Sequence, residues 1–146
     1  MKPTAALPFV ILVLGMTLKS VALMVIQGQR RTKTRTFRWP EDAAHWRGVV
    51  SSDEDAQTLR AQAALRNDGE SQPYFLAAVA AWIGLGAEET LALIVCGTYL
   101  VLRGLHSAFL IWPRQPLRNR LFGLSLLCLF VVLADCVRLL LSARGR

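Results

Sequence analysis

The sequence predicts an all-α integral membrane protein, a bundle of four transmembrane helices that forms a single domain over residues 1–146. Hydrophobic residues make up 53% of the chain and charged residues only 18%, a balance that favours a membrane protein over a soluble domain. The charges are concentrated in residues 28–72 and 113–120, between apolar runs. The net charge is +7, and the charged segments flank the apolar runs. The expected partner is therefore a membrane surface and not a nucleic acid.

The first span is expected at residues 7–27, about the ~20 residues that the hydrocarbon core of a bilayer requires. Lys19 interrupts this run, so its side chain should face other helices or extend toward the membrane boundary. Residues 28–56 form a long polar connection in which Pro40 and the region of Gly48 should break any helix.

The second helix is expected at residues 57–86, with Ser51 or Ser52 and Glu54 as its capping residues. Its first half is amphipathic, and only its second half is apolar. The polar half must therefore be covered by protein or project from the bilayer. Pro73 lies inside this helix and should kink it.

The third and fourth spans are expected at residues 90–112 and 117–142, on either side of a short link rich in Pro and Arg. Asp135 and Arg138 lie three residues apart on the fourth span and should pair with each other. Three cysteines lie inside apolar runs without the spacing of a metal site, so they are interpreted as small apolar core residues.

The distribution of Lys and Arg predicts the orientation. The first and third links, with the polar start of the second helix, carry eleven Lys and Arg residues, whereas the middle link carries none. The positive-inside rule then places residues 28–56 and 113–120 in the cytoplasm and both termini on the opposite side of the membrane.

Polar side chains gather toward the cytoplasmic ends of the predicted helices. Charged groups are costly inside a bilayer, so each of them needs a structural or functional reason. On the second helix four of these residues fall near one face, at spacings of three, four and seven, and Arg66 lies beside that face. Similar groups occur on the third helix and beside the first and fourth. The set consists of Arg31, Lys33, Arg60, Arg66, Asn67, Glu70, Tyr74, Arg103, His106, Ser107 and Arg118.

This set suits a small anionic peptide that carries one ammonium group. Guanidinium groups bind carboxylates through two parallel hydrogen bonds, and a single Glu suits an α-amino group. An Asn side chain can both donate to and accept from a peptide unit. The alternative is that the polar residues pair with one another, for example Arg66 with Glu70, but the surplus of Arg then has no internal anion.

Four motifs, in order along the chain, resemble the membrane-associated proteins in eicosanoid and glutathione metabolism, the MAPEG family. They are the basic run and P-E-D-A turn of residues 28–43, RNDGE at residues 66–70, RGLH at residues 103–106 and QPLR at residues 115–118. Within the family, the resemblance is strongest to the microsomal prostaglandin E synthases and the microsomal glutathione transferases.

The resemblance implies a homotrimer that binds glutathione between adjacent subunits, near the cytoplasmic face. It also implies a lipophilic second substrate that enters from the bilayer, and contacts with membrane lipids. The glutathione contacts that it implies are Arg31, Arg66, Asn67, Glu70, Arg103, His106 and Arg118.

Two positions depart from the family pattern. Ala63 stands where members often have another Arg, and Leu110 stands where many have a Tyr. The first change should weaken anion binding, and the second removes a hydroxyl group. Arg60, one turn earlier, could reach in as partial compensation.

The leading hypothesis is a glutathione-dependent membrane transferase, peroxidase or isomerase in which Arg118 stabilises the glutathione thiolate. His106 could act as a general base, although a hydrogen bond between helices is the more common role of a membrane histidine. A non-catalytic lipid-binding or scaffold member of the same fold is the alternative. A transporter or channel is disfavoured, because no polar stripe runs through both leaflets, and no metal-binding motif is visible.

Overall fold

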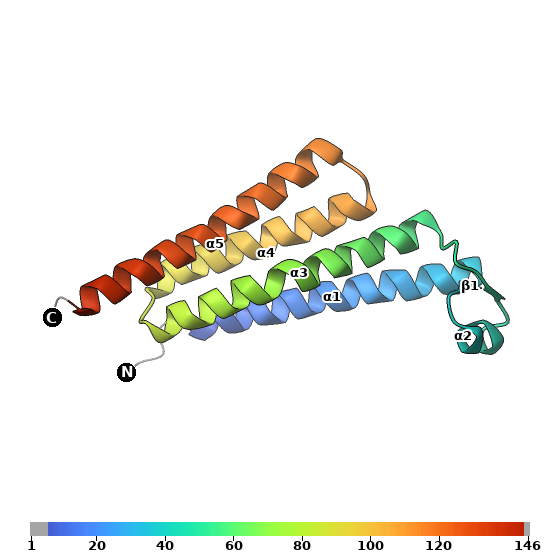
Figure 1. Ribbon diagram of the computed structural model, residues 1–146, viewed down its shortest axis with the longest axis horizontal. Helices are drawn as coiled ribbons and strands as arrows, with labels where there is room; N and C mark the ends of the chain where they lie inside the picture. Colours follow the sequence, from blue (N-terminus) through green and yellow to red (C-terminus); the bar gives the residue numbers. More distant parts are fainter. Residues whose placement is uncertain (1–5, 145–146) are drawn as a thin grey trace.

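A computed structural model describes residues 6–144 of the chain. Four long helices run side by side and alternate in direction, so that both ends of the described chain lie at the same end of the bundle (Figure 1). The helices are α1 (Ala6–Thr34), α3 (Ala56–Gly84), α4 (Glu89–Ile111) and α5 (Gln115–Arg144). The predicted all-α four-helix membrane bundle is confirmed.

Three of the four helices, α1, α4 and α5, are long and apolar enough to cross a membrane by length and composition. Large apolar side chains such as Leu14, Leu127 and Leu141 remain exposed on their outer faces, as expected where lipid replaces water. In α3 the polar first half lowers the mean hydropathy of the helix. Pro73 lies inside α3 without ending it.

The connection from α1 to α3 is folded against the end of the bundle. Helix α1 continues to Thr34, beyond the apolar span, because Arg31 and Lys33 in its last turn interact favourably with the helix dipole. It ends where Arg35 adopts a left-handed backbone with φ of 50°.

Two short parallel strands then flank a helix of one and a half turns. They are β1 (Thr36–Phe37) and β2 (Val49–Val50), and α2 (Pro40–His45) lies between them. Gly48 allows the chain to pass close to the backbone of Arg35, since a Cβ at this position would lie only 2.5 Å from the carbonyl oxygen of Arg35.

Helix α3 is capped by Asp55, so the prediction that Ser51 or Ser52 with Glu54 would cap it is wrong. The Asp55 carboxylate accepts hydrogen bonds from the backbone N–H groups of the first turn, at 3.2 and 3.4 Å. The Ser51 hydroxyl instead accepts the N–H of Asp53, which tightens the preceding turn.

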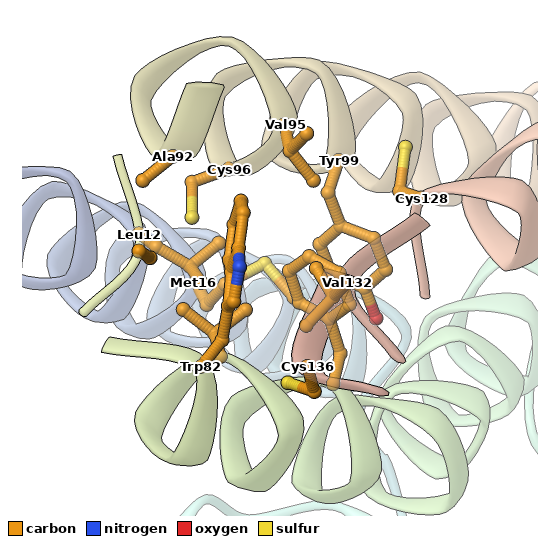
Figure 2. Packing of buried hydrophobic residues seen from close by; sticks show 13 residues of the cluster. Leu12, Met16, Trp82, Ala92, Val95, Cys96, Tyr99, Cys128, Val132 and Cys136 are labelled. Carbon is orange, nitrogen blue, oxygen red and sulfur yellow. The ribbon is translucent and has the colours of Figure 1, made fainter. Parts of the chain in front are cut away.

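All four helices contribute to the apolar core. Figure 2 shows Leu12 and Met16 of α1, Trp82 of α3, Tyr99 of α4 and Val132 of α5 pointing toward one another. The three cysteines are buried and form no disulfide, as their apolar surroundings indicated.

Polar groups at the edge of this core are also paired. The Trp82 indole N–H donates to Asp135 at 2.8 Å, which satisfies a donor that would be costly to bury alone. Asp135 also accepts from Arg138, and the pair predicted from their spacing is confirmed.

Candidate functional site

A cleft of about 390 Å³ lies toward the basic end of the bundle, where α3, α4 and α5 meet. Its volume is within the range of roughly 300–1,000 Å³ that is typical of small-molecule sites. Three helices contribute side chains to its walls, and most of these are polar. The lining residues are Ala63, Arg66, Asn67, Glu70, His106, Leu110, Arg118, Asn119 and Phe122.

Helix α3 supplies one cation, one amide and one anion to the cleft. Arg66 and Asn67 precede Glu70 by four and three residues, so each lies on the helix surface next to Glu70, and all three line the cleft. Among residues 6–144 no ion pair joins Arg66 to Glu70, which was the alternative to a ligand role. Both charges are exposed toward the cleft and are available to a ligand.

Asn67 is oriented by a guanidinium group from α4. Nη2 of Arg103 lies 2.5 Å from the side-chain oxygen of Asn67 and 3.4 Å from its backbone oxygen. Because a guanidinium group has only donors, the Asn67 side chain must present its oxygen to Arg103. Its NH₂ group forms no hydrogen bond within the described part of the chain, and the residue lines the cleft.

Behind the cleft, Asp68 is buried between two cations from other helices. Its Oδ1 lies 2.8 Å from Nζ of Lys19 on α1 and 2.9 Å from Nη2 of Arg103 on α4. Arg103 is fully buried, and Asp68 is only 3% exposed. Lys19 therefore faces other helices, as predicted, and the ion network joins α1, α3 and α4 behind Asn67.

Sequence reasoning missed the role of Asp68. The residue lies inside the RNDGE motif, but its two partners are far away in the chain. The signal that could have found it is the pair of cations inside apolar spans, Lys19 and Arg103, since buried cations require an anion.

His106 of α4 and Arg118 of α5 both line the cleft. The His106 ring is buried and packs against Phe122 with 5.9 Å between ring centroids. Its Nδ1 has no hydrogen-bond partner among residues 6–144, so the expected bond to another helix is not formed through this nitrogen. Arg118 is half-buried in the first turn of α5, where the positive end of the helix dipole adds to its charge.

The structure thus brings together five of the seven residues that the resemblance implies as glutathione contacts. Arg31 and Arg103 do not line the cleft. Arg31 is paired with Glu54, 2.6 Å from Nε to Oε1, and Arg103 supports Asn67 from within the bundle. Direct contact of any of the seven residues with glutathione stays a prediction.

Both departures from the family pattern lie in the wall of the cleft. Ala63 and Leu110 each contribute an apolar side chain to its lining. Arg60 does not line the cleft, because its Nη1 donates to the backbone oxygen of Leu110 at 3.4 Å. The expected compensation for Ala63 is therefore not formed in this arrangement.

No curated protein matches the chain. The family model described as the MAPEG family matches residues 6–138, which cover nearly the whole chain and all the residues of the cleft. The four helices, the cleft toward the basic end and this match lead to one conclusion: the chain belongs to the MAPEG family.

Proposed function

We propose that this protein is a glutathione-dependent membrane transferase, peroxidase or isomerase acting on a lipophilic electrophile or lipid peroxide. Membership of the MAPEG family supports a glutathione-related membrane function of this general kind. The observation that carries the more specific proposal is the meeting of Arg66, Asn67, Glu70 and Arg118 in one cleft. None of the three charged side chains among them has an ion-pair partner within residues 6–144.

The polar side chains of the cleft match the charged and polar groups of glutathione. Glutathione carries two carboxylates, one ammonium group and two peptide units. Arg66 is suited to a carboxylate, Glu70 to the ammonium group and the free NH₂ of Asn67 to a peptide carbonyl. Arg31, which lies outside the cleft of its own chain, would meet the glutathione of a neighbouring subunit in the proposed homotrimer.

Arg118 is the proposed catalytic residue. Glutathione supplies the thiolate that attacks the electrophile or the peroxide. A fixed guanidinium charge at the start of α5 favours this thiolate over the neutral thiol, and the helix dipole acts in the same direction. Leu110 offers no hydroxyl group, so Arg118 is the side chain in the cleft best suited to this role. His106, whose buried ring packs against Phe122, would help to fix the shape of the cleft between α4 and α5.

An apolar groove between α4 and α5 supports a lipophilic second substrate. It has a volume of about 350 Å³ and opens on the outer, lipid-facing surface of the two helices. Its walls are apolar apart from one hydroxyl, so it suits a hydrocarbon chain. The lining residues are Ile94, Val95, Thr98, Leu102, Leu124, Leu127, Cys128 and Val131.

The proposed orientation places the cleft on the cytoplasmic side, where glutathione is available. Cysteine residues introduced at Ser52 and Glu88 should then react with a membrane-impermeant label from opposite sides. Labelling of both positions from the same side would contradict this orientation.

The second candidate is a lipid-binding or scaffold protein of the same fold without catalytic activity. The observation in its favour is that Ala63 and Leu110, the two departures from the family pattern, both line the cleft. This alternative does not require glutathione to bind.

A screen of the purified protein separates the two candidates. Thermal unfolding in detergent should shift to a higher temperature with glutathione, because a ligand that binds only the folded state stabilises it by mass action. Conjugation and peroxidase assays with a panel of lipophilic electrophiles and peroxides should then show turnover. The scaffold does not predict a glutathione-dependent thermal shift, so the absence of both a shift and turnover would support the scaffold and contradict glutathione binding. A shift together with turnover would support the glutathione-dependent enzyme.

A further inference from the structure

A second cleft, of about 330 Å³, lies between the end of α1, the start of α3 and the end of α4. It is separate from the first cleft, in which glutathione binding is proposed, and shares no lining residue with it. Two cations and two side-chain amides line it together with three large apolar residues. The lining residues are Ile26, Gln29, Arg30, Lys33, Gln57, Ile111 and Trp112.

The positive charge of this second cleft is not neutralised by its surroundings. No carboxylate lines it, and neither Arg30 nor Lys33 forms an ion pair in the described part of the chain. The two acids that directly precede α3 are already engaged. Glu54 pairs with Arg31, and Asp55 accepts the backbone N–H groups at the start of α3. A site with two cations and amide donors therefore favours an external anion.

The apolar part of the lining indicates the kind of anion. Ile26 precedes the two cations by one and two helical turns on α1, toward the membrane-spanning part of the helix. Ile111 is buried at the end of α4, and Trp112 follows it with 60% of its surface exposed. A tryptophan at the end of a membrane-spanning helix is typical of the membrane boundary. A ligand here would place its charged group beside Arg30 and Lys33 and an apolar part along the isoleucines.

We propose that this second cleft binds the phosphate headgroup of an anionic phospholipid. Basic pockets between transmembrane helices at the cytoplasmic side are suited to such headgroups, and each nearby Lys or Arg strengthens the binding about fivefold. The lipid would join α1 to α4 at the basic end and help to hold this end at the membrane surface. The proposal does not rest on glutathione binding and stands or fails separately from it.

The test titrates phosphatidylglycerol into the full-length protein in neutral detergent and follows the midpoint of thermal unfolding. The double variant Arg30→Gln/Lys33→Gln removes both cations of the cleft. The matched control, Arg114→Gln/Arg120→Gln, removes two cations from the same end of the bundle but outside this cleft. Phosphatidylcholine and inorganic phosphate are titrated in parallel.

We expect phosphatidylglycerol to raise the unfolding midpoint of the parent and of the control with similar apparent affinity. The affinity of the double variant should be lower by about twenty-five-fold, the product of two fivefold losses. An equal loss in the control would show only a general charge effect and would overturn the proposal. Equal stabilisation by phosphatidylcholine or by inorganic phosphate would overturn the assignment to an anionic lipid. Should the double variant fold poorly, Lys33→Gln alone, at an exposed position, must still lose about fivefold.

Discussion

Arg66 and Glu70 stand one turn apart on α3, and both are left free to meet a ligand. The sequence could identify this face, because spacings of three and four on a helix are local and regular. It could not show that the pair would stay apart, since that depends on the side-chain conformations that the three-helix cleft permits.

Replacement of Glu70 by Gln should weaken glutathione binding and spare the fold. The change removes the one carboxylate among the residues that line the cleft. The Gln side chain has nearly the same size as Glu and still forms hydrogen bonds. Loss of a charge-assisted hydrogen bond corresponds to roughly 1.5–3 kcal/mol. Thermal unfolding curves of both proteins, with and without glutathione, measure the effect. A lower unfolding midpoint in the absence of glutathione would instead show that Glu70 has a structural partner.

Replacement of Asp68 by Asn should destabilise the fold itself. Lys19 and Arg103 would then be left as buried cations without their shared anion, which costs roughly 3–5 kcal/mol when one partner of a buried pair is removed. Arg114→Gln is the control, because Arg114 is exposed, lies outside the predicted spans and forms no ion pair in the described part of the chain. Unfolding midpoints in one detergent compare the two, and a similar loss in both variants would refute the role of Asp68.

At the scale of helices and strands, local rules predicted most of the structure. The helices expected at residues 57–86 and 90–112 end one or two residues earlier in the structure, at Gly84 and Ile111, and the pair between Asp135 and Arg138 follows from their spacing on one helix. Contacts between distant segments could not be predicted. Asp68 meets partners 49 and 35 residues away, which no local pattern encodes. The cap of α3 was also misplaced, because Ser51 was needed by the preceding turn.

The start of α4 should depend on the ionisation of Glu88. The exposed Glu88 carboxylate accepts the backbone N–H groups of Thr90 and Leu91 at 2.8 and 2.7 Å, and these bonds lower its pKa below the ordinary value of 4.5. A depressed pKa in the folded state means that the stabilisation is complete above the unfolded pKa and is lost as the pH falls through the folded pKa.

Unfolding midpoints measured between about pH 6 and pH 3 should therefore fall more steeply for the parent than for Glu88→Gln, since only the parent has this carboxylate to protonate. The two proteins should converge at the acid end. Parallel profiles would show that the cap contributes nothing that depends on pH.

At the scale of the whole molecule, the isolated chain leaves part of α3 incompletely covered. Arg66 and Glu70 are exposed on a helix that packs between α1, α4 and α5, and exposed charges cannot face lipid. This supports the proposed assembly, in which neighbouring subunits cover the polar half of α3.

Native mass spectrometry in a mild detergent should accordingly detect a trimer. The resemblance to the MAPEG family implies this stoichiometry, and the need to cover the polar half of α3 provides its physical reason. A spectrum that contains only monomer would contradict the assembly and, with it, the proposed contribution of Arg31 to a neighbouring subunit.

The bundle as a whole brings Arg118 of α5 to the cleft that holds Glu70 and Asn67 of α3, and this placement is the basis of the proposed chemistry. The most direct test is steady-state turnover of Arg118→Ala with a lipophilic electrophile, together with glutathione binding by calorimetry and Arg114→Ala as the control outside the cleft. Loss of one electrostatic stabiliser of the developing thiolate should lower turnover by on the order of a hundredfold. Glutathione affinity should change far less, because the contacts from α3 remain, and Arg114→Ala should resemble the parent. If Arg118→Ala turns over glutathione at the parental rate, Arg118 does not activate the thiol and the account of the site is wrong.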